Sequence, residues 1–138
     1  MPNLPITGFD HLSLVCKRHG ATLHFYTSVL SFRMTMPTPP DTIDKWAMME
    51  LRAGEAALVL IDTTHPNGAW ALSPRGPGEN IHHFCLRLAL FDGAALRQRL
   101  RDAHIAIEEE SDEGAERAFY IRDPEGNLVE LRGPWLAE

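Results

Sequence analysis

The amino-acid sequence predicts an α+β fold, with two repeated βαβββ modules that form a cupped mixed sheet. The first observation is internal similarity: at an offset of 72 residues, His11 falls opposite His83 and Gly54 opposite Gly126. The second is that each half carries one strand pattern, one helical pattern and three further strand patterns in that order. We therefore interpret residues 1–138 as a single domain, with module one at about 6–62, a linker at about 63–80 and module two at about 81–134.

Each module opens on a strand that carries a histidine near its start, at residues 9–15 and 81–87. A helix is predicted next, because apolar residues recur at spacings of three and four. The residues in this pattern are Leu23, Tyr26 and Leu30 in module one and Leu96, Leu100 and Ala103 in module two. Asp92 is the residue type preferred at a helix N-cap, so we expect the second helix to begin there.

Three strands are predicted after each helix. They cover residues 32–36, 46–51 and 56–61 in module one and residues 105–109, 118–122 and 128–132 in module two. Gly54 and Gly126 precede the last strand of each module and can supply the positive φ that a tight turn needs. The acidic run at residues 108–113 is interpreted as a solvated strand end and loop.

Alternation along the strands predicts which side chains lie on the open face of the sheet, away from the helices. Apolar side chains at alternate positions should form the core face, and they are Leu12, Leu14 and Cys16, then Phe84, Leu86 and Leu88, then Val129 and Leu131. The open face should therefore carry His11, His83 and Glu130, with Arg87 and Tyr120 as candidates for contacting a substrate.

Glu130 needs a partner, because an ionised carboxylate buried in mid-strand is costly unless it is paired or bound to a metal. Two imidazoles and one carboxylate are a common ligand set for Fe, Mn, Ni, Co or Zn ions, with coordination positions left open for substrate. We therefore predict a divalent metal site at His11, His83 and Glu130. The alternative for Glu130 is an ion pair with Arg87 or Arg132.

Three segments resemble the vicinal oxygen chelate superfamily of glyoxalases, bleomycin resistance proteins and extradiol dioxygenases. They are Asp10-His11-Leu12-Ser13-Leu14, residues 25–32 (FYTSVLSF) and residues 119–130 (FYIRDPEGNLVE), and the similarity extends over essentially the whole chain. The resemblance implies that His11, His83 and Glu130 are the metal ligands. The position equivalent to Glu130 in module one is Leu58, within one residue of register, so three ligands are expected and not four.

The resemblance also implies an activity and an assembly. We expect a metal-dependent lyase or isomerase for a small molecule with neighbouring oxygens, in which the metal stabilises an enolate or oxyanion and Glu130 belongs to the catalytic centre. A homodimer is expected, with His11 from one subunit facing His83 and Glu130 of the other. The alternatives are a metal-free drug- or metabolite-binding protein, a dioxygenase and a fosfomycin-type transferase.

Composition argues against other classes of partner. A formal charge of −6 provides no basic surface for nucleic acid, and the longest apolar run, residues 56–61, is far shorter than the roughly 20 residues of a membrane span. Met1-Pro2-Asn3-Leu4-Pro5 has neither the charge nor the apolar stretch of a secretory signal, so we expect a cytoplasmic protein.

Overall fold

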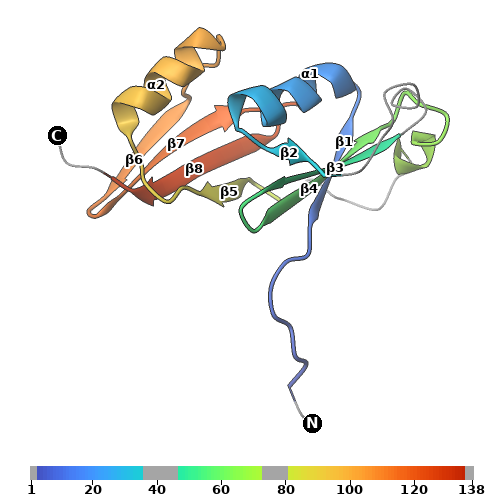
Figure 1. Ribbon diagram of the computed structural model, residues 1–138, viewed down its shortest axis with the longest axis horizontal. Coiled ribbons are helices and arrows are strands. Elements are labelled where there is room, and N and C mark those ends of the chain that lie inside the picture. Colours follow the sequence, from blue (N-terminus) through green and yellow to red (C-terminus); the bar gives the residue numbers. More distant parts are fainter. Residues whose placement is uncertain (1–2, 36–46, 73–80, 136–138) are drawn as a thin grey trace.

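The computed structural model describes residues 3–35, 47–72 and 81–135, and it confirms two βαβββ modules (Figure 1). Module one contains β1 (Leu12–Cys16), α1 (His19–His24), the π-helix η1 (Phe25–Val29), β2 (Arg33–Met34), β3 (Met48–Ala53) and β4 (Ala56–Asp62). Module two contains β5 (Phe84–Arg87), α2 (Gly93–Asp102), β6 (Glu109–Glu113), β7 (Glu116–Arg122) and β8 (Leu128–Pro134). A short 3₁₀ helix, η3 (Ala69–Leu72), lies between the modules in the chain.

The two sheets share one topology. Their strand orders are β1-β4-β3-β2, called sheet A here, and β5-β8-β7-β6, called sheet B. In each sheet the first strand of the module pairs in parallel with the last, and the remaining pairs are antiparallel. Each first strand therefore lies at an edge of its sheet, with the last strand beside it.

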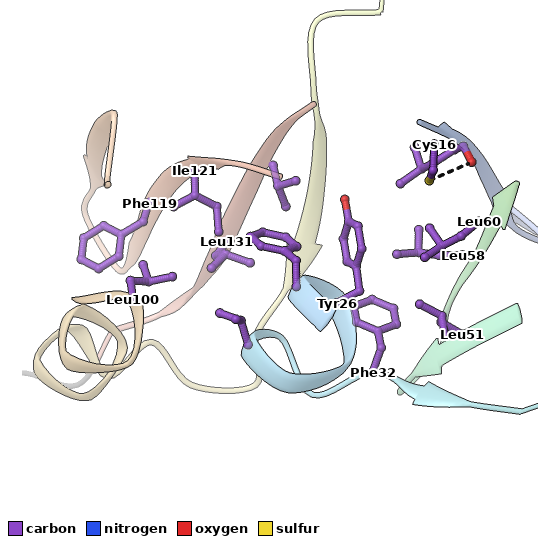
Figure 2. Packing of buried hydrophobic residues seen from close by; sticks show 14 of the residues in the cluster. Cys16, Tyr26, Phe32, Leu51, Leu58, Leu60, Leu100, Phe119, Ile121 and Leu131 are labelled. Atoms are coloured by element: carbon purple, nitrogen blue, oxygen red, sulfur yellow. Dashed lines mark hydrogen bonds between the residues drawn. The ribbon is translucent and has the colours of Figure 1, made fainter. Parts of the chain in front are cut away.

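The helices lie on the same side of the two sheets, and one continuous core joins the modules (Figures 1 and 2). Tyr26 is fully buried, and Figure 2 shows it between Leu58 and Leu60 of sheet A and Ile121 and Leu131 of sheet B. Its ring packs edge-on against the rings of Phe25 and Phe32. The modules are therefore stabilised by burial of the same side chains.

The helical pattern of module one is confirmed, although its second half is a π-helix. Phe25, Tyr26 and Val29 are all buried there, and the wider turn continues to Leu30, whose amide donates to the carbonyl of Phe25 at 3.1 Å. The N-cap of α2 is also confirmed, because the Asp92 carboxylate accepts a hydrogen bond from the amide of Ala95.

One predicted strand is misplaced. Residues 105–109 were expected to form the strand after α2, but β6 is Glu109–Glu113, so most of the acidic run is a strand and not a loop. Ile105 and Ile107 alternate because they pack against the core beside α2. The acidic residues pair with β7, and charges on an edge strand oppose further strand addition.

The turn after β7 connects the two modules through polar contacts. Glu125 accepts hydrogen bonds from the amides of Lys17 and Arg18 in module one, at 3.0 and 2.6 Å. The hydroxyl of Tyr26 donates to buried Asp123 at 2.6 Å. The turn itself ends on Gly126 at φ 88°, and the predicted tight turn at Gly54 has φ 54°.

Some expectations lie outside the described residues, namely the end of the strand at 32–36, the start of the strand at 46–51 and the second half of the linker at 63–80. Among the described helices, none is long and apolar enough to span a membrane.

Candidate metal centre

The open face of sheet B carries a row of polar side chains from neighbouring strands. Cys85 of β5 pairs with Glu130 of β8, and Glu130 pairs with Tyr120 of β7. Val129 and Leu131, on either side of Glu130, are buried in the core. Strand alternation therefore directs Glu130 to the open face, as the sequence predicts.

His83 and Glu130 converge on each other. Nε2 of His83 lies 3.0 Å from Oε1 of Glu130. Nδ1 of His83 contacts Nδ1 of His82 at 2.7 Å, which leaves Nε2 as the nitrogen that faces the carboxylate. Two donor atoms that bind one ion at about 2.1 Å and at right angles are themselves about 3.0 Å apart. The contact is that of a hydrogen bond between the imidazole and the carboxylate, and the same separation is compatible with adjacent positions in the coordination shell of a divalent ion.

Glu130 is only 4% exposed, yet it stays ionised. Burial raises the pKa of its carboxyl. Hydrogen bonds from Arg132 and Tyr120, the charge of Arg132 and the contact with His83 together lower the pKa by more than burial raises it, so the net pKa lies below the ordinary value. Nε of Arg132 donates to Oε2 of Glu130 at 2.6 Å. The ion pair considered as the alternative for Glu130 is therefore present, with Arg132 and not with Arg87.

His11 lies immediately before β1, and its ring is half-exposed. Its Nδ1 is 2.7 Å from Oδ1 of Asp10. A carboxylate on one ring nitrogen is the usual arrangement for a metal-binding histidine, because it fixes the ring and leaves the other nitrogen for the ion. Sequence reasoning did not single out Asp10, although a carboxylate next to a candidate ligand is a usable signal.

The three predicted ligands are not brought together within one chain. His11 and His83 both line a pocket of about 420 Å³ between the start of β1, the β3–β4 turn and β5. In the part of the chain that the structure describes, no group of three His, Cys, Asp or Glu side chains could hold an ion. His83 and Glu130 form a pair at sheet B, whereas His11 lies just before β1, the edge strand of sheet A.

The two candidate substrate contacts lie on the same open face as Glu130. Tyr120 packs edge-on against the ring of His83, with ring centroids 5.5 Å apart. Arg87 is largely exposed, and its guanidinium donates to Glu116 at 2.9 Å. Neither residue belongs to the buried core, and Tyr120 is the one of the two that contacts His83.

A model of the Glyoxalase/Bleomycin resistance protein/Dioxygenase superfamily matches residues 8–131. This match spans β1 to most of β8 and includes His11, His83 and Glu130. The chain belongs to this superfamily. The superfamily contains enzymes and binding proteins, so membership leaves the chemistry open.

Solved structures share the fold over nearly the whole chain. A lactoylglutathione lyase from Agrobacterium tumefaciens has 22% identity and a TM-score of 0.65, covering 94% of this chain and 96% of that one. A glyoxalase/dioxygenase from Nostoc punctiforme has 18% identity, a TM-score of 0.66 and coverage of 97% and 99%. TnmS3, an antibiotic-binding protein from a Streptomyces species, has 20% identity, a TM-score of 0.59 and coverage of 96% and 99%. None of the curated protein sequences matches the chain.

Proposed function

We propose that this superfamily member is a metal-dependent enzyme for a small molecule with neighbouring oxygens, with lyase or isomerase chemistry. The observation that carries the proposal is the 3.0 Å approach of His83 Nε2 to Oε1 of Glu130, a buried carboxylate. A divalent ion at this pair would act as a Lewis acid toward the oxygens of the substrate.

The residues of the open face have separate roles in this proposal. His83 and Glu130 hold the ion, and Glu130 is the ligand that belongs to the catalytic centre. Tyr120 and Arg87 contact the substrate, Tyr120 through its ring beside His83 and Arg87 through its exposed guanidinium. Fe, Mn, Ni, Co and Zn all accept this mixture of imidazole and carboxylate ligands.

His11 of a second copy completes the site in our proposal, which requires a homodimer. Support comes from the chain before β1, which extends away from the body of the molecule (Figure 1). Its apolar side chains Leu4, Ile6 and Phe9 are 78%, 76% and 101% exposed, and an extended segment with three such residues is suited to packing on another subunit. His11 lies at the base of this segment, with Nδ1 already engaged by Asp10.

A second candidate function is metal-free binding of a drug or metabolite. The observation that favours it is the Arg132–Glu130 ion pair, which supplies the buried carboxylate with a cation. The pocket of about 420 Å³ that His11 and His83 line is large enough for a small molecule. TnmS3 shares the fold, so the scaffold is compatible with binding alone.

Metal titration separates the two functions. We expect the purified wild-type protein to bind Co²⁺ or Zn²⁺ stoichiometrically, and we expect Glu130→Gln to lose at least about 100-fold in affinity, more than the 10- to 100-fold typical of an outer contact. Glu50→Gln is the matched control, because Glu50 pairs with an arginine on the open face of sheet A and should leave affinity unchanged. Equal affinity of wild type and Glu130→Gln would leave metal-free binding as the better account.

A further inference from the structure

Arg132, on β8, contacts three carboxylates of sheet B. Its Nε donates to Oε2 of Glu130 at 2.6 Å, and its two terminal nitrogens donate to the two oxygens of Glu113 at 2.8 and 3.2 Å. Oε1 of Glu116 lies 3.6 Å from the same guanidinium. The side chain is only 17% exposed and spans from β8 across β7 to β6.

We propose that Arg132 is a positioning residue that fixes the carboxylate of Glu130 for metal binding, an inference that rests on the function proposed above. Because Arg132 occupies Oε2, the other oxygen, Oε1, is the one turned toward Nε2 of His83. Arg132 thereby presents one carboxylate oxygen beside the imidazole and keeps the other from rotating into its place.

The geometry requires an arginine. A guanidinium is planar and carries donors on two edges, so it can bind Glu130 along one edge and both oxygens of Glu113 along the other. A lysine carries its three donors on one nitrogen and lacks the planar fork that binds both oxygens of Glu113 in parallel while a separate donor reaches Glu130. Glu113 anchors Arg132 from β6, and the anchored guanidinium then sets the plane of the Glu130 carboxylate.

Module one carries uncharged side chains at the positions equivalent to Glu130 and Arg132. Ser13 pairs with Val59 in sheet A where Cys85 pairs with Glu130 in sheet B, and Val15 pairs with Ile61 where Arg87 pairs with Arg132. The same strand positions are thus compatible with apolar side chains. The Glu130–Arg132 pair is therefore not a requirement of the βαβββ fold, which favours a role at the site.

An alternative role for Arg132, neutralising the charge of Glu130, predicts the opposite change in metal affinity when Arg132 is removed. If the guanidinium serves only to neutralise Glu130, it competes with a metal ion for the carboxylate, and its removal should increase metal affinity. If it positions Glu130, its removal should decrease metal affinity, because outer contacts of metal ligands typically contribute 10- to 100-fold. The direction of the change separates the two roles.

The experiment is a Co²⁺ titration of the full-length protein, followed by the visible absorption of the bound cobalt. We expect Arg132→Gln to weaken binding about 10- to 100-fold. Arg132→Lys should weaken it in the same direction, and both should alter the cobalt spectrum because the carboxylate is no longer held in one orientation. Arg122→Gln is the matched control, since Arg122, the last residue of β7, pairs with Glu108, just before β6, and not with Glu130.

Glu113→Gln keeps the proposal testable if the Arg132 variants do not fold. Glu113 is exposed and touches Arg132 but not Glu130, so this variant should fold and show a smaller loss of cobalt affinity with the same direction. Unchanged or tighter cobalt binding in Glu113→Gln and in the folded Arg132 variants would overturn the positioning role alone. Absence of cobalt binding by the wild-type protein would overturn the proposed function and this inference together.

Discussion

β4 and β8 hold the same place in the two sheets, yet their open faces carry opposite chemistry. β4 presents Val59 and Ile61, whereas β8 presents Glu130 and Arg132 at the matching positions of the strand pairing. The helix-side faces do not differ in this way, because both are apolar and enter one core. The two modules thus share an apolar helix-side face, which forms the core, while their open faces differ and only that of β8 carries the charged pair.

The largest effect is expected where the two modules do not differ, in the shared core. Tyr26→Ala should reduce the free energy of unfolding by about 4 kcal/mol, because it removes a fully buried aromatic side chain between the sheets. Urea denaturation followed by circular dichroism and by tryptophan fluorescence measures it. Both signals should shift together, because the two modules share this side chain.

Tyr26→Phe is the control for that experiment. It keeps the ring and removes the hydrogen bond to Asp123, so a loss of about 1 to 2 kcal/mol is expected. If the two signals of Tyr26→Ala separated into two transitions, the modules would be independent units and the single core would be wrong.

Exchanging side chains between the modules tests whether the fold needs the charges on the open face of β8. The double variant Glu130→Val with Arg132→Ile copies the side chains of β4 onto β8, and we expect it to fold with a melting temperature no lower than that of Arg132→Ile alone. The reason is that the single variant leaves a buried carboxylate without its cation, whereas the double variant removes both charges. Metal binding should be lost in the double variant.

That experiment is decided by the order of the melting temperatures. A double variant less stable than the single variant would mean that Glu130 contributes to folding independently of Arg132. The open face of sheet B would then have a structural requirement that sheet A lacks.

The smallest expected effect is a change in the pH dependence of stability when a side chain of module two is placed in module one. His19 begins α1, and 72 positions later module two has the buried Phe91. Burial lowers the pKa of His19 below its ordinary value of 6.5, against the charges of nearby Asp62 and Glu125. Its Nε2 is buried and has no hydrogen-bond partner among the residues that the structure describes. The neutral ring is therefore favoured in the folded state, so the stability that it contributes is complete above pH 6.5 and decreases as the pH falls toward the lower folded pKa.

His19→Phe should remove that dependence. We expect the difference in urea midpoint between His19→Phe and wild type to grow in favour of the variant as the pH is lowered from 8 to 5. A difference that stays constant over this range would show that the proton affinity of His19 is the same in the folded and unfolded states.

Much of the site could be predicted from sequence because strand alternation is local. Alternation alone directed His83 and Glu130 to the open face. Glu130 lies there on β8, whereas His83 immediately precedes β5, which begins at Phe84 and not at residue 81, and is 3.0 Å from Glu130. By strand register, the position in module one equivalent to Glu130 is Val59, one residue from the predicted Leu58. Neither side chain can bind a metal, so the expectation of three ligands rather than four does not depend on this shift.

Other features depend on contacts that no local pattern contains. The position of β6 follows from its pairing with β7, so the alternation of Ile105 and Ile107 was misleading. The π-helix at Phe25–Val29 carries three buried side chains, and the apolar spacing of the sequence does not distinguish it from an α-helical turn. The separation of His11 from Glu130 within a chain depends on how the modules meet, and repeat symmetry predicts equivalence of the histidines without fixing the distance between them.

The central claim is a metal site shared between two copies of the chain, and complementation tests it most directly. His11→Ala and Glu130→Gln subunits, each alone, should bind no Co²⁺. Co-expressed with different affinity tags and purified as the mixed dimer, they should bind one ion per dimer, because one of the two sites then receives His11 from one subunit and His83 with Glu130 from the other. A mixed dimer without bound ion, beside a wild-type protein that binds it, would contradict the shared site.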